Sequence, residues 1–561
     1  MEEEMAEMTD RIFFGPYAMQ TALGNGEETV SAIAAYSIGL KFNERYGMIV
    51  GEIPGKASID GYTELESLMI SQIGSVLEAS GLELSDGSVR LVVSTTKGNV
   101  GLLEGNTDNV PGDAFLYRSA AKVAAHFNAS SEPTVISNAC ISGVSAFVVA
   151  RRMILTRECA HVVVAGCDML NEFITSGFAS FKSISGACCR PYDASRNGLN
   201  LGEASAAVLL TSDRAKATLP YIRLEGGSVT NDANHISGPS RTGDGLYYAI
   251  RNAMDEAGLV PDDIGFVNAH GTATVYNDEM ESKALALAGL SDKPLNSMKG
   301  YIGHTLGASG VVETLICVSE LRNGIVYGTM GFSETGVPCP VNVSSEHRPL
   351  GLLRCVKTAS GFGGCNAAVV LAADEYGDRP DSCPKVAEAE VTAEYALPEG
   401  GFPFAELIRE EYRALESPNM KFFKMSDLCK GAYVAVEYLM RQSHLAERYG
   451  STEIAVILAN SSASLDTDLE HQRILERRLP EGTSPAVFVY TLPSVAAGEV
   501  CIRNRFQGDN TFFVGEDASM ADAYARLLIE RGYAKAAVCG WCDKLGEDYK
   551  VEMKVMEIKN I

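Results

Sequence analysis

Short runs of aliphatic residues alternate with helical segments along most of the chain. The runs expected to be strands buried on both faces are RLVVSTT (90–96), TVISNA (134–139), HVVVAGC (161–167), AAVLLTS (206–212), IGFVNAHG (264–271) and AAVVLAA (367–373). Continuous apolar runs of this length are typical of mostly parallel sheet that helices cover on both faces. The pattern therefore predicts an α/β protein.

The hydrophobic pattern stops between Asp374 and Gly400. This segment contains eight acidic residues and three prolines, and it has little periodic hydrophobicity. Such composition is typical of a connection between domains. The sequence therefore predicts a first domain at 1–373, an acidic linker at 374–401 and a second domain at 402–561.

The second domain repeats the element order of the first. The helix at 63–82 and the strand that follows it have counterparts in SDLCKGAYVAVEYLMRQSHL and EIAVILANSSAS. The segments SAFVVARRMI and HVVVAGCDML have counterparts in ADAYARLLIERG and AAVCGWCDKL. The identity is weak but order and spacing are kept, which indicates a second copy of only the first half of the N-terminal domain. Unrelated α/β patterning is the alternative.

Cys140 is the first candidate for covalent chemistry. It lies between a predicted buried strand and a helix of about 16 residues that begins near Ile141. The positive end of a helix dipole favours the thiolate form of a cysteine. Cys140 is therefore a candidate nucleophile, and a buried structural cysteine is the alternative.

Other residues with catalytic chemistry follow Cys140 along the chain. His270 ends a predicted strand, and NSMKGYIGHTLGASGVVE supplies Lys299, His304 and Glu313 around a glycine-rich turn. The segment TASGFGGCNAAVVL surrounds Phe362 with glycines, whose backbone can approach a reacting atom closely. Taken singly, each of these motifs is a weak signal.

Taken together, five motifs resemble the β-ketoacyl-[acyl-carrier-protein] synthases over about residues 11 to 373. The motifs are NACISG (138–143), PYDASRNGLNLGEASAAVLL (191–210), HGTATVYND (270–278), KGYIGHTLGASGVVE (299–313) and GFGGCN (361–366). The resemblance implies a thiolase fold, a five-layered αβαβα arrangement of two similar halves. The C-terminal portion would then be a partial thiolase-like α/β domain.

The resemblance also implies a reaction, the decarboxylative Claisen condensation that extends a fatty-acid or polyketide chain by two carbons. Cys140 corresponds to the nucleophile that takes an acyl group from a carrier-protein thioester. His270 and His304 resemble the pair that binds the malonyl thioester carbonyl and stabilises the enolate, as in the elongating members of the family. Lys299 corresponds to the lysine that supports the histidines, and Glu313 to the acid that orders the site.

Further assignments come from the same resemblance. The backbone N–H groups of Cys140 and Phe362 would form the oxyanion hole, and Phe362 would be the gating aromatic. The substrate loops would contain Gly361, Gly363, Gly364, Thr272 and Thr274. Asp193, Arg196, Glu203 and Asp278 fall on family positions that we assign to structure. Ser360 and Cys365 depart from the family, which often has an aromatic residue and a threonine there, so the shape of the acyl pocket is open.

The second copy has no cysteine at the nucleophile position, which falls at Gly515 or Asp517. It also ends before any counterpart of His270 or His304. It resembles the non-catalytic partner subunits called chain-length factors, and it either covers the active domain and shapes its acyl tunnel or only stabilises it. The CGWC motif at 539–542 has the spacing of a thioredoxin-like redox pair. Such a pair should open a helix after a strand, whereas this motif follows the predicted strand AKAAV without opening a helix, so a redox role is not favoured.

Composition limits the partners. With 47 Lys and Arg against 72 Asp and Glu, the net charge of −25 argues against nucleic acid or an anionic membrane. The acidic N-terminus is no targeting signal, so a cytoplasmic protein with reduced cysteines is expected. We expect no metal and no bound cofactor, only phosphopantetheine-linked acyl and malonyl thioesters of acyl carrier protein. Because carrier proteins are acidic, the candidate docking residues are Arg118, Lys122, Arg151 and Arg152.

The family resemblance implies a homodimer through residues about 90 to 160. Two other functions stay open. A thiolase-type acyl-CoA acyltransferase would carry a second catalytic cysteine, for which Cys365 is the candidate. A scaffold or chain-length partner of another synthase would not condense at all, and the complete set of Cys140, His270 and His304 disfavours it. The fused half-copy favours a specialised polyketide or polyene pathway over housekeeping fatty-acid synthesis.

Overall fold

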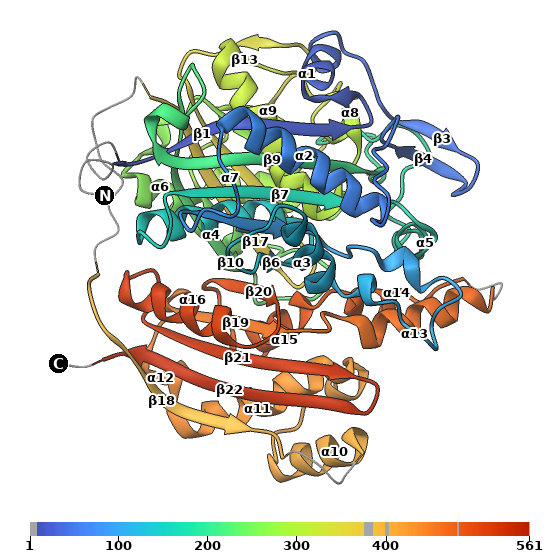
Figure 1. The fold of residues 1–561 in the computed structure, drawn as a ribbon, viewed down its shortest axis with the longest axis vertical. Helices are drawn as coiled ribbons and strands as arrows, with labels where there is room; N and C mark the ends of the chain where they lie inside the picture. Colours follow the sequence, from blue (N-terminus) through green and yellow to red (C-terminus); the bar gives the residue numbers. More distant parts are fainter. Residues whose placement is uncertain (1–7, 375–384, 399–402, 479–481, 560–561) are drawn as a thin grey trace.

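The computed structural model describes residues 8–374, 385–398, 403–478 and 482–559. Its first domain contains two similar half-sheets (Figure 1). In the first, the order is β6 (Thr134–Ile136), β5 (Val89–Ser94), β7 (His161–Asp168), β9 (Ala204–Asp213) and β1 (Met8–Thr21). In the second, it is β12 (Pro294–Asn296), β11 (Phe266–Asn268), β16 (Arg354–Gly361), β17 (Cys365–Ala373) and β10 (Ile222–Asn231). In both, the first three strands are parallel and the last two antiparallel.

Helices complete a five-layered arrangement. The helices α4 (Ser142–Leu155) and α9 (Ser309–Asn323) contact strands of both half-sheets and form the middle layer. The helix α2 (Glu64–Ser80) covers the outer face of the first half-sheet, and α6 (Asp244–Ala257) covers that of the second. The predicted thiolase fold is therefore confirmed for the first domain.

The two middle helices cross closely because glycines meet at the crossing. A Cβ atom on Gly143 of α4 would lie only 2.6 Å from the backbone nitrogen of Val311 in α9. One on Gly310 would lie 2.4 Å from the backbone nitrogen of Val144. Both distances are shorter than any normal carbon contact, so larger side chains would force the helices apart. This crossing fixes the N-terminus of α4, where Cys140 lies.

The second domain repeats the first half-sheet strand by strand. Its order is β20 (Asn510–Val514), β19 (Ile454–Asn460), β21 (Ala536–Leu545), β22 (Asp548–Ile558) and β18 (Ala389–Ala396), with the same parallel and antiparallel pairings. The helices α11 (Asp427–Ser443) and α16 (Ser519–Glu530) take the places of α2 and α4. The predicted half-copy is therefore present in the structure.

One predicted boundary is corrected. The strand β18 lies inside the segment 374–401 that the sequence assigns to a linker, and it pairs with β22. It is an edge strand, and acidic side chains such as Glu390 and Glu394 are exposed on it. Edge strands commonly carry charge instead of an apolar run, which is why no hydrophobic pattern marks β18.

The two domains join through their sheets. The strand β6 pairs on one side with β5 and on the other with β20, antiparallel, with Ile136 opposite Phe513. The side chain of Asn138 donates to the carbonyl of Asn510 at 2.8 Å and accepts from the backbone of Phe512 at 3.0 Å. The C-terminal domain therefore occupies the edge of β6 within one chain.

This pairing occupies one strand edge within residues about 90 to 160, the region through which a homodimer is expected from sequence. A second copy of the chain cannot pair with β6 while β20 occupies that edge, because each strand has only two hydrogen-bonding sides. Buried ion pairs extend the same junction, between Lys97 and Asp468 at 2.6 Å and between Arg152 and Asp509 at 2.8 Å.

Among the described residues, no single helix is long and apolar enough to cross a membrane. One pair of helices, bent by 103° at the break between them, would be long and apolar enough by length and composition.

Candidate active site

Cys140 lies in the tight turn between β6 and α4. The residue before it, Ala139, has a φ of +49°, a conformation that side-chain-bearing residues seldom adopt. Cys140 is 9% exposed, and its side chain lines a cavity of about 370 Å³. The strained turn thus presents the thiol to a cavity rather than to the core.

The structure brings the three predicted catalytic side chains together. The Sγ atom of Cys140 lies 3.1 Å from Nε2 of His304, and the rings of His270 and His304 meet edge to face at 5.1 Å between centroids. His270 follows β11, and His304 lies in the turn before α9. Segments more than a hundred residues apart in sequence therefore converge on the base of the cavity.

Each histidine has a fixed second partner. The Nδ1 atom of His304 lies 3.0 Å from the hydroxyl of Ser309. A hydroxyl can donate or accept, so this contact holds either tautomer of the ring. The ammonium of Lys299 donates to the carbonyl of His270 at 2.6 Å and lies 3.3 Å from its Nδ1.

A buried triad of charges supports this arrangement. The carboxylate of Glu313 lies 2.7 Å from the ammonium of Lys299 and 2.6 Å from that of Lys357, and all three side chains are at most 1% exposed. Burial opposes the ionisation of Glu313, but the two ammonium charges outweigh it and lower its pKa. Sequence analysis identifies Lys299 and Glu313 but misses Lys357. The one sign of Lys357 in the sequence is that a charged residue occurs within an otherwise apolar strand.

Glu281 is a second residue that sequence analysis misses. Its carboxylate accepts from the backbone N–H of His270 at 2.9 Å and from that of Gly271 at 2.6 Å. The hydroxyls of Tyr192 and Thr358 also donate to it. Glu281 therefore fixes the backbone that carries His270.

Burial favours the neutral forms of Cys140, His270 and His304. It lowers the pKa of His270 and of His304 well below their usual value, and the charge of Lys299 lowers both further. Burial also raises the pKa of the Cys140 thiol to about 12, although Lys299 acts in the opposite direction. Burial therefore outweighs the effect of the helix dipole, which the sequence analysis expects to favour the thiolate.

The turn between β16 and β17 closes one side of the cavity. A Cβ atom on Gly361 would lie 3.1 Å from the backbone nitrogen of Cys140, so this turn approaches the nucleophile through its backbone. Phe362 packs against Phe181 at 5.2 Å and stacks on Phe178 at 6.1 Å between ring centroids. Gly363 and Gly364 both have positive φ, which glycine adopts without strain.

The C-terminal domain extends this aromatic wall. Phe488, from α14 (Pro485–Phe488), packs against Phe178 at 5.5 Å and Phe181 at 6.2 Å. A Cβ atom on Gly498 of the same domain would lie 2.5 Å from the carbonyl of Gly363. The second domain therefore contacts both the wall and the turn that carries Phe362.

The remaining predicted residues take several positions. Thr272 and Thr274 line the cavity and share a hydroxyl hydrogen bond of 2.8 Å. Ser360 also lines it and donates to the side chain of Asn366 at 2.7 Å. Cys365 is buried and contacts the carbonyls of Phe362 and Asn138. Asp193, Arg196, Glu203 and Asp278 have the loop-organising contacts expected of them, for example from the backbone of Tyr192 to Asp278 at 2.8 Å.

Two of the predicted docking residues are buried, which corrects that prediction. Arg151 pairs with Glu256 and is 2% exposed, and Arg152, 3% exposed, pairs with Asp509. Both lie on α4, which is covered on all sides. Lys122 is partly buried and pairs with Glu66 and Asp113, so of the four only Arg118 is exposed.

The sulfur and imidazole nitrogens of Cys140, His270 and His304 lie within 4.8 Å of one another, a distance that also suits a metal ion. The buried ammonium of Lys299, 3.3 Å from His270, would repel a divalent cation there. The positive charge therefore favours an anionic reaction intermediate over a metal.

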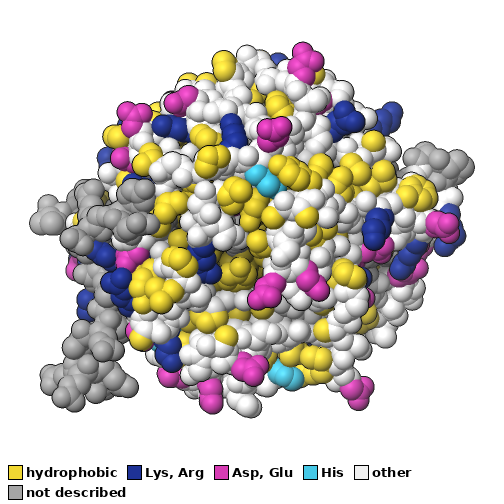
Figure 2. Space-filling model, turned by 90° about the horizontal axis from the view of Figure 1, so that it is seen from above, with side chains coloured by type: hydrophobic (Ala, Val, Ile, Leu, Met, Phe, Trp, Pro, Cys, Tyr) yellow, Lys and Arg dark blue, Asp and Glu magenta, His cyan; other side chains and the backbone are white. Residues whose placement is uncertain are grey.

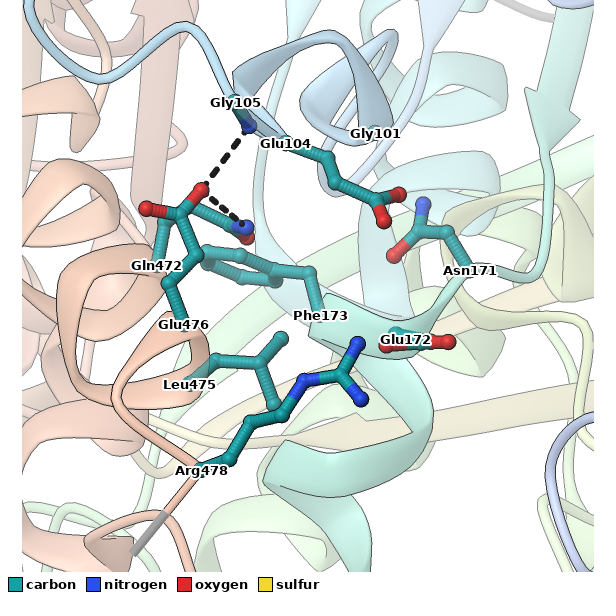
Figure 3. Close-up of a pocket in the computed structure, with 10 residues that line it drawn as sticks. All are labelled: Gly101, Glu104, Gly105, Asn171, Glu172, Phe173, Gln472, Leu475, Glu476 and Arg478. Atoms are coloured by element: carbon teal, nitrogen blue, oxygen red, sulfur yellow. Dashed lines mark hydrogen bonds between the residues drawn. The ribbon is translucent and has the colours of Figure 1, made fainter.

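A second cavity, of about 220 Å³, lies where α13 (Leu465–Glu476) meets the first domain (Figure 3). Glu476 accepts there from the backbone of Gly105 at 2.9 Å and from Gln472 at 3.1 Å. The other residues that line this cavity are Gly101, Glu104, Asn171, Glu172, Phe173, Leu475 and Arg478. It contains no nucleophile and is a feature of the domain junction.

The second copy places an acid where the first has its thiol. Ser94 pairs with Ile136 in the first domain and Ala459 with Phe513 in the second, so Cys140 corresponds to Asp517. Asp517 is exposed and accepts from the backbone of Ser519 at 2.8 Å. The CGWC motif lies in the middle of β21, with both cysteines buried, so it does not open a helix.

Comparison with known proteins agrees with this architecture. The β-ketoacyl synthase N-terminal domain matches residues 94–215, and the β-ketoacyl synthase C-terminal domain matches residues 221–333. The 3-oxoacyl-[acyl-carrier-protein] synthase 2 of Mycobacterium leprae (strain TN) is 32% identical over 266 residues, which are 45% of this chain. The match spans 63% of the length of that relative.

Two solved structures are similar in fold. A ketosynthase in complex with its chain length factor from Xenorhabdus doucetiae is 25% identical, with a TM-score of 0.58 over 65% of this chain and 98% of that chain. The PfaC keto synthase–chain length factor is 13% identical, with a TM-score of 0.79 over 98% of this chain and 78% of that chain, a likeness of fold alone. The first domain of this chain is therefore similar to the β-ketoacyl synthases, whose N-terminal and C-terminal domains match residues 94–215 and 221–333.

Proposed function

We propose that the chain condenses an acyl group held on Cys140 with the malonyl thioester of an acyl carrier protein and so extends the acyl chain by two carbons. The observation that carries the proposal is the convergence of Cys140 with two neutral imidazoles at the base of one cavity. The buried triad of Lys299, Glu313 and Lys357 supports it by holding His270 in place.

The first step is transfer of the acyl group. The thiol of Cys140 passes its proton to Nε2 of His304 and attacks the carbonyl of the incoming thioester. A carbon–sulfur bond forms to Cys140, the bond to the phosphopantetheine sulfur breaks, and the proton returns to that departing thiolate. The backbone N–H groups of Cys140 and Phe362 stabilise the tetrahedral oxyanion.

The second step is decarboxylation of the malonyl group. Carbon dioxide leaves, and its bonding electrons form an enolate whose oxygen accepts hydrogen bonds from His270 and His304. Neutral imidazoles suit this task, because donors fixed in a dry site stabilise charge that develops during the reaction. The Lys299 ammonium lies at Nδ1 of His270 and holds that ring in the tautomer that donates through Nε2. The Ser309 hydroxyl can donate or accept, so Nε2 of His304 can accept a proton in the first step and donate in the second.

The third step forms the new carbon–carbon bond. The enolate carbon attacks the acyl carbonyl on Cys140, the carbon–sulfur bond breaks, and the departing Cys140 thiolate takes one proton from solvent water. The apolar side of the cavity, with Phe178, Phe181, Leu199 and Phe362, suits the acyl chain.

In this proposal the C-terminal domain is a non-catalytic partner that shapes the acyl pocket. Asp517 stands where a nucleophile would be, and Phe488 supports the aromatic wall behind Phe362. The similarity of fold to ketosynthase–chain length factor structures supports this role and favours a specialised polyketide or polyene pathway. The thiolase-type alternative is disfavoured, since Cys365 does not line the cavity.

Intact-protein mass spectrometry tests the proposal. The full chain is incubated with a panel of acyl-carrier proteins, beside the Cys140→Ala variant. We expect one acyl adduct on the wild-type chain and none on the variant, followed by a product two carbons longer when malonyl-carrier protein is added. The absence of an adduct with every donor would overturn the proposal in favour of a scaffold for another synthase.

A further inference from the structure

The turn that carries Cys140 (137–141) is held on one side by the start of α4. Ala139 has a φ of +49°, and a strained conformation of this kind persists only where the surroundings fix it. The backbone N–H of Asn138 donates to the hydroxyl of Ser142 at 2.8 Å, and that hydroxyl donates to the carbonyl of Ala139 at 2.6 Å. These two bonds fix the turn against the first residue of the helix.

The other side of the Cys140 turn is held by the second domain. The side chain of Asn138 is fully buried and does not line the cavity. Its nitrogen donates to the carbonyl of Asn510 at 2.8 Å, and its oxygen accepts from the N–H of Phe512 at 3.0 Å. The backbone N–H of Ser137 also donates to the carbonyl of Phe512, at 3.1 Å. Because these partners belong to β20, the residue two positions before the nucleophile is bonded to the other domain.

A second path leads from His304 toward the domain junction. Asp168, at the end of β7, accepts from the backbone N–H of Gly307 at 2.7 Å and from that of Thr96 at 3.1 Å. Gly307 lies three residues after His304, and a Cβ atom on it would lie 2.8 Å from the Asp168 carboxylate. Through Asp168, the turn that follows β5 (95–97) therefore supports the turn that carries His304.

The turn 95–97 is itself held by the second domain, through Lys97. The ammonium of Lys97 lies 2.6 Å from the carboxylate of Asp468, on α13. It also donates to the hydroxyl of Ser464 at 3.1 Å and to the carbonyl of Thr491 at 2.6 Å. An ammonium has three donors, so these partners occupy all of them.

Lys97 differs from the charges at the surface. On the face shown in Figure 2, Lys and Arg side chains lie at the surface among Asp and Glu side chains. The side chain of Lys97 is only 5% exposed. A buried ion pair adds little stability beyond that of apolar side chains of similar volume. What the bonds of Lys97 do provide is a fixed position for the turn 95–97.

We infer that Asn138 and Lys97 are positioning residues, through which the second domain fixes Cys140 and His304 at reacting distance. Asn138 acts on the Cys140 turn, and Lys97 acts on the His304 turn through Asp168. The quantity they control is the 3.1 Å between Sγ of Cys140 and Nε2 of His304. The kinetic part of this inference rests on the proposed function.

The first test replaces Asn138 by Leu, which has a similar volume and makes no hydrogen bond. Acylation of Cys140 is measured with the acyl thioester of N-acetylcysteamine, per folded molecule, and near-ultraviolet circular dichroism gives the folded fraction. We expect kcat to fall by about 10–100-fold, because a misplacement of about 1 Å is costly to a reaction. KM should stay within about twofold of the wild type, because no group that lines the cavity changes.

Alkylation of Cys140 by iodoacetamide provides a readout that a merely structural role would not move. His304 takes the proton of the thiol in the wild type, so the thiol reacts near pH 7. In Asn138→Leu this base is displaced, and we expect the ratio of the rates at pH 7 and pH 9 to fall about tenfold. Mass spectrometry of the peptide that contains Cys140 separates it from the other cysteines. A loss of folded molecules alone would leave the ratio unchanged.

The second test removes the buried pair in the double variant Lys97→Met, Asp468→Asn. Both charges are lost together, so neither is left buried without a partner. We expect the decarboxylation of a malonyl thioester, which depends on His304, to fall about fivefold in kcat, with KM within about twofold of the wild type.

A matched control removes a different bond between the domains. The hydroxyl of Tyr533, in the second domain, donates to the carboxylate of Glu256, on α6, at 2.7 Å. Tyr533→Phe loses this bond but alters neither reacting turn, so we expect wild-type values of kcat and of the alkylation ratio.

Two outcomes would overturn the positioning role: wild-type kcat and alkylation ratio in the variants of Asn138 and Lys97, or equal losses in Tyr533→Phe. A wild-type chain that accepts no acyl group from any thioester, but whose alkylation ratio falls as expected in Asn138→Leu, would overturn the proposed function and support the positioning role of Asn138.

Discussion

The two copies of the half-sheet have the same strand order and the same directions, yet only one has a cysteine in the turn after its short strand. They differ in the turn after the short strand: β6 leads to Cys140, and β20 leads to Asp517. The buried strands determine the scaffold, whereas a few residues of one turn determine whether it can perform chemistry.

A structural carboxylate is retained in both copies. Asp168, at the end of β7, accepts from the hydroxyls of Thr95 and Thr96 at 2.9 and 2.8 Å. Asp543, at the same place in β21, accepts from the backbone of Ser461 at 3.3 Å and from that of Ser462 at 3.2 Å. Asp168 alone has a further task, since it also accepts from the backbone of Gly307, in the turn that carries His304. The second copy therefore keeps the carboxylate that organises the backbone at this end of the sheet.

The difference between Cys140 and Asp517 should produce the largest effect. We expect Cys140→Ala to lower the condensation rate by about 10³-fold or more, because no covalent acyl-enzyme can form. Asp517→Ala should leave the rate unchanged. Product formation over time measures both. A similar loss in the two variants would mean that the second copy takes part in the chemistry.

The next effect concerns the buried charges of the first domain. Glu313→Gln leaves the ammoniums of Lys299 and Lys357 buried without a counter-charge, so the free energy of unfolding should fall by about 3–5 kcal/mol. Condensation should fall as well, because Lys299 orients His270. Urea denaturation and kcat measure the two losses. The matched change in the copy, Asp543→Asn, should reduce stability but leave kcat per folded molecule unchanged.

The contact of the copy with the acyl pocket should have a smaller effect. Phe488→Ala removes an aromatic ring that supports Phe178 and Phe181, and we expect a stability loss of about 3 kcal/mol. The space released should shift the preferred acyl donor toward longer chains. Competition among acyl-carrier proteins of increasing chain length measures this. An unchanged preference would restrict the second domain to a stabilising role.

The smallest effect is a dependence on pH. The pKa values of His270 and His304 are lowered in the folded chain, so the unfolded chain binds more protons below the ordinary value of 6.5. The stability that these residues contribute is therefore complete above about pH 6.5 and decreases as the pH falls below it. Urea titrations at pH 5 and pH 7.5 should show a smaller acid loss in His270→Asn than in the wild type.

Much of the site could be predicted from sequence because its residues lie in motifs. Cys140, His270, Lys299, His304 and Glu313 each occur in a recognisable segment, and the structure brings them together. The residues that sequence analysis misses act through contacts between distant segments. Lys357 of β16 meets Glu313 of the helix α9, and Phe488 packs from the other domain against Phe178, which lines the pocket.

The wrong predictions have a common cause. Arg151 and Arg152 look exposed on a helix considered alone, but α4 lies between two sheets and against a second domain. The strand β18 is recognisable only by its partner β22, because its own side chains are mostly polar. Tertiary context determines both features, and a single sequence does not reveal it.

The pairing of β6 with β20 also affects how the chain is made. Asn138 and its partner Phe512 are separated by 374 residues, so the first domain is complete long before the strand that covers it is synthesised. At about 5–20 residues per second, the edge of β6 waits roughly 20–75 s. A strand of three residues is a short edge, which limits pairing with other chains during that time. Once β20 covers that edge, every molecule has one complete first domain and one half-copy in a fixed ratio, whatever the protein concentration.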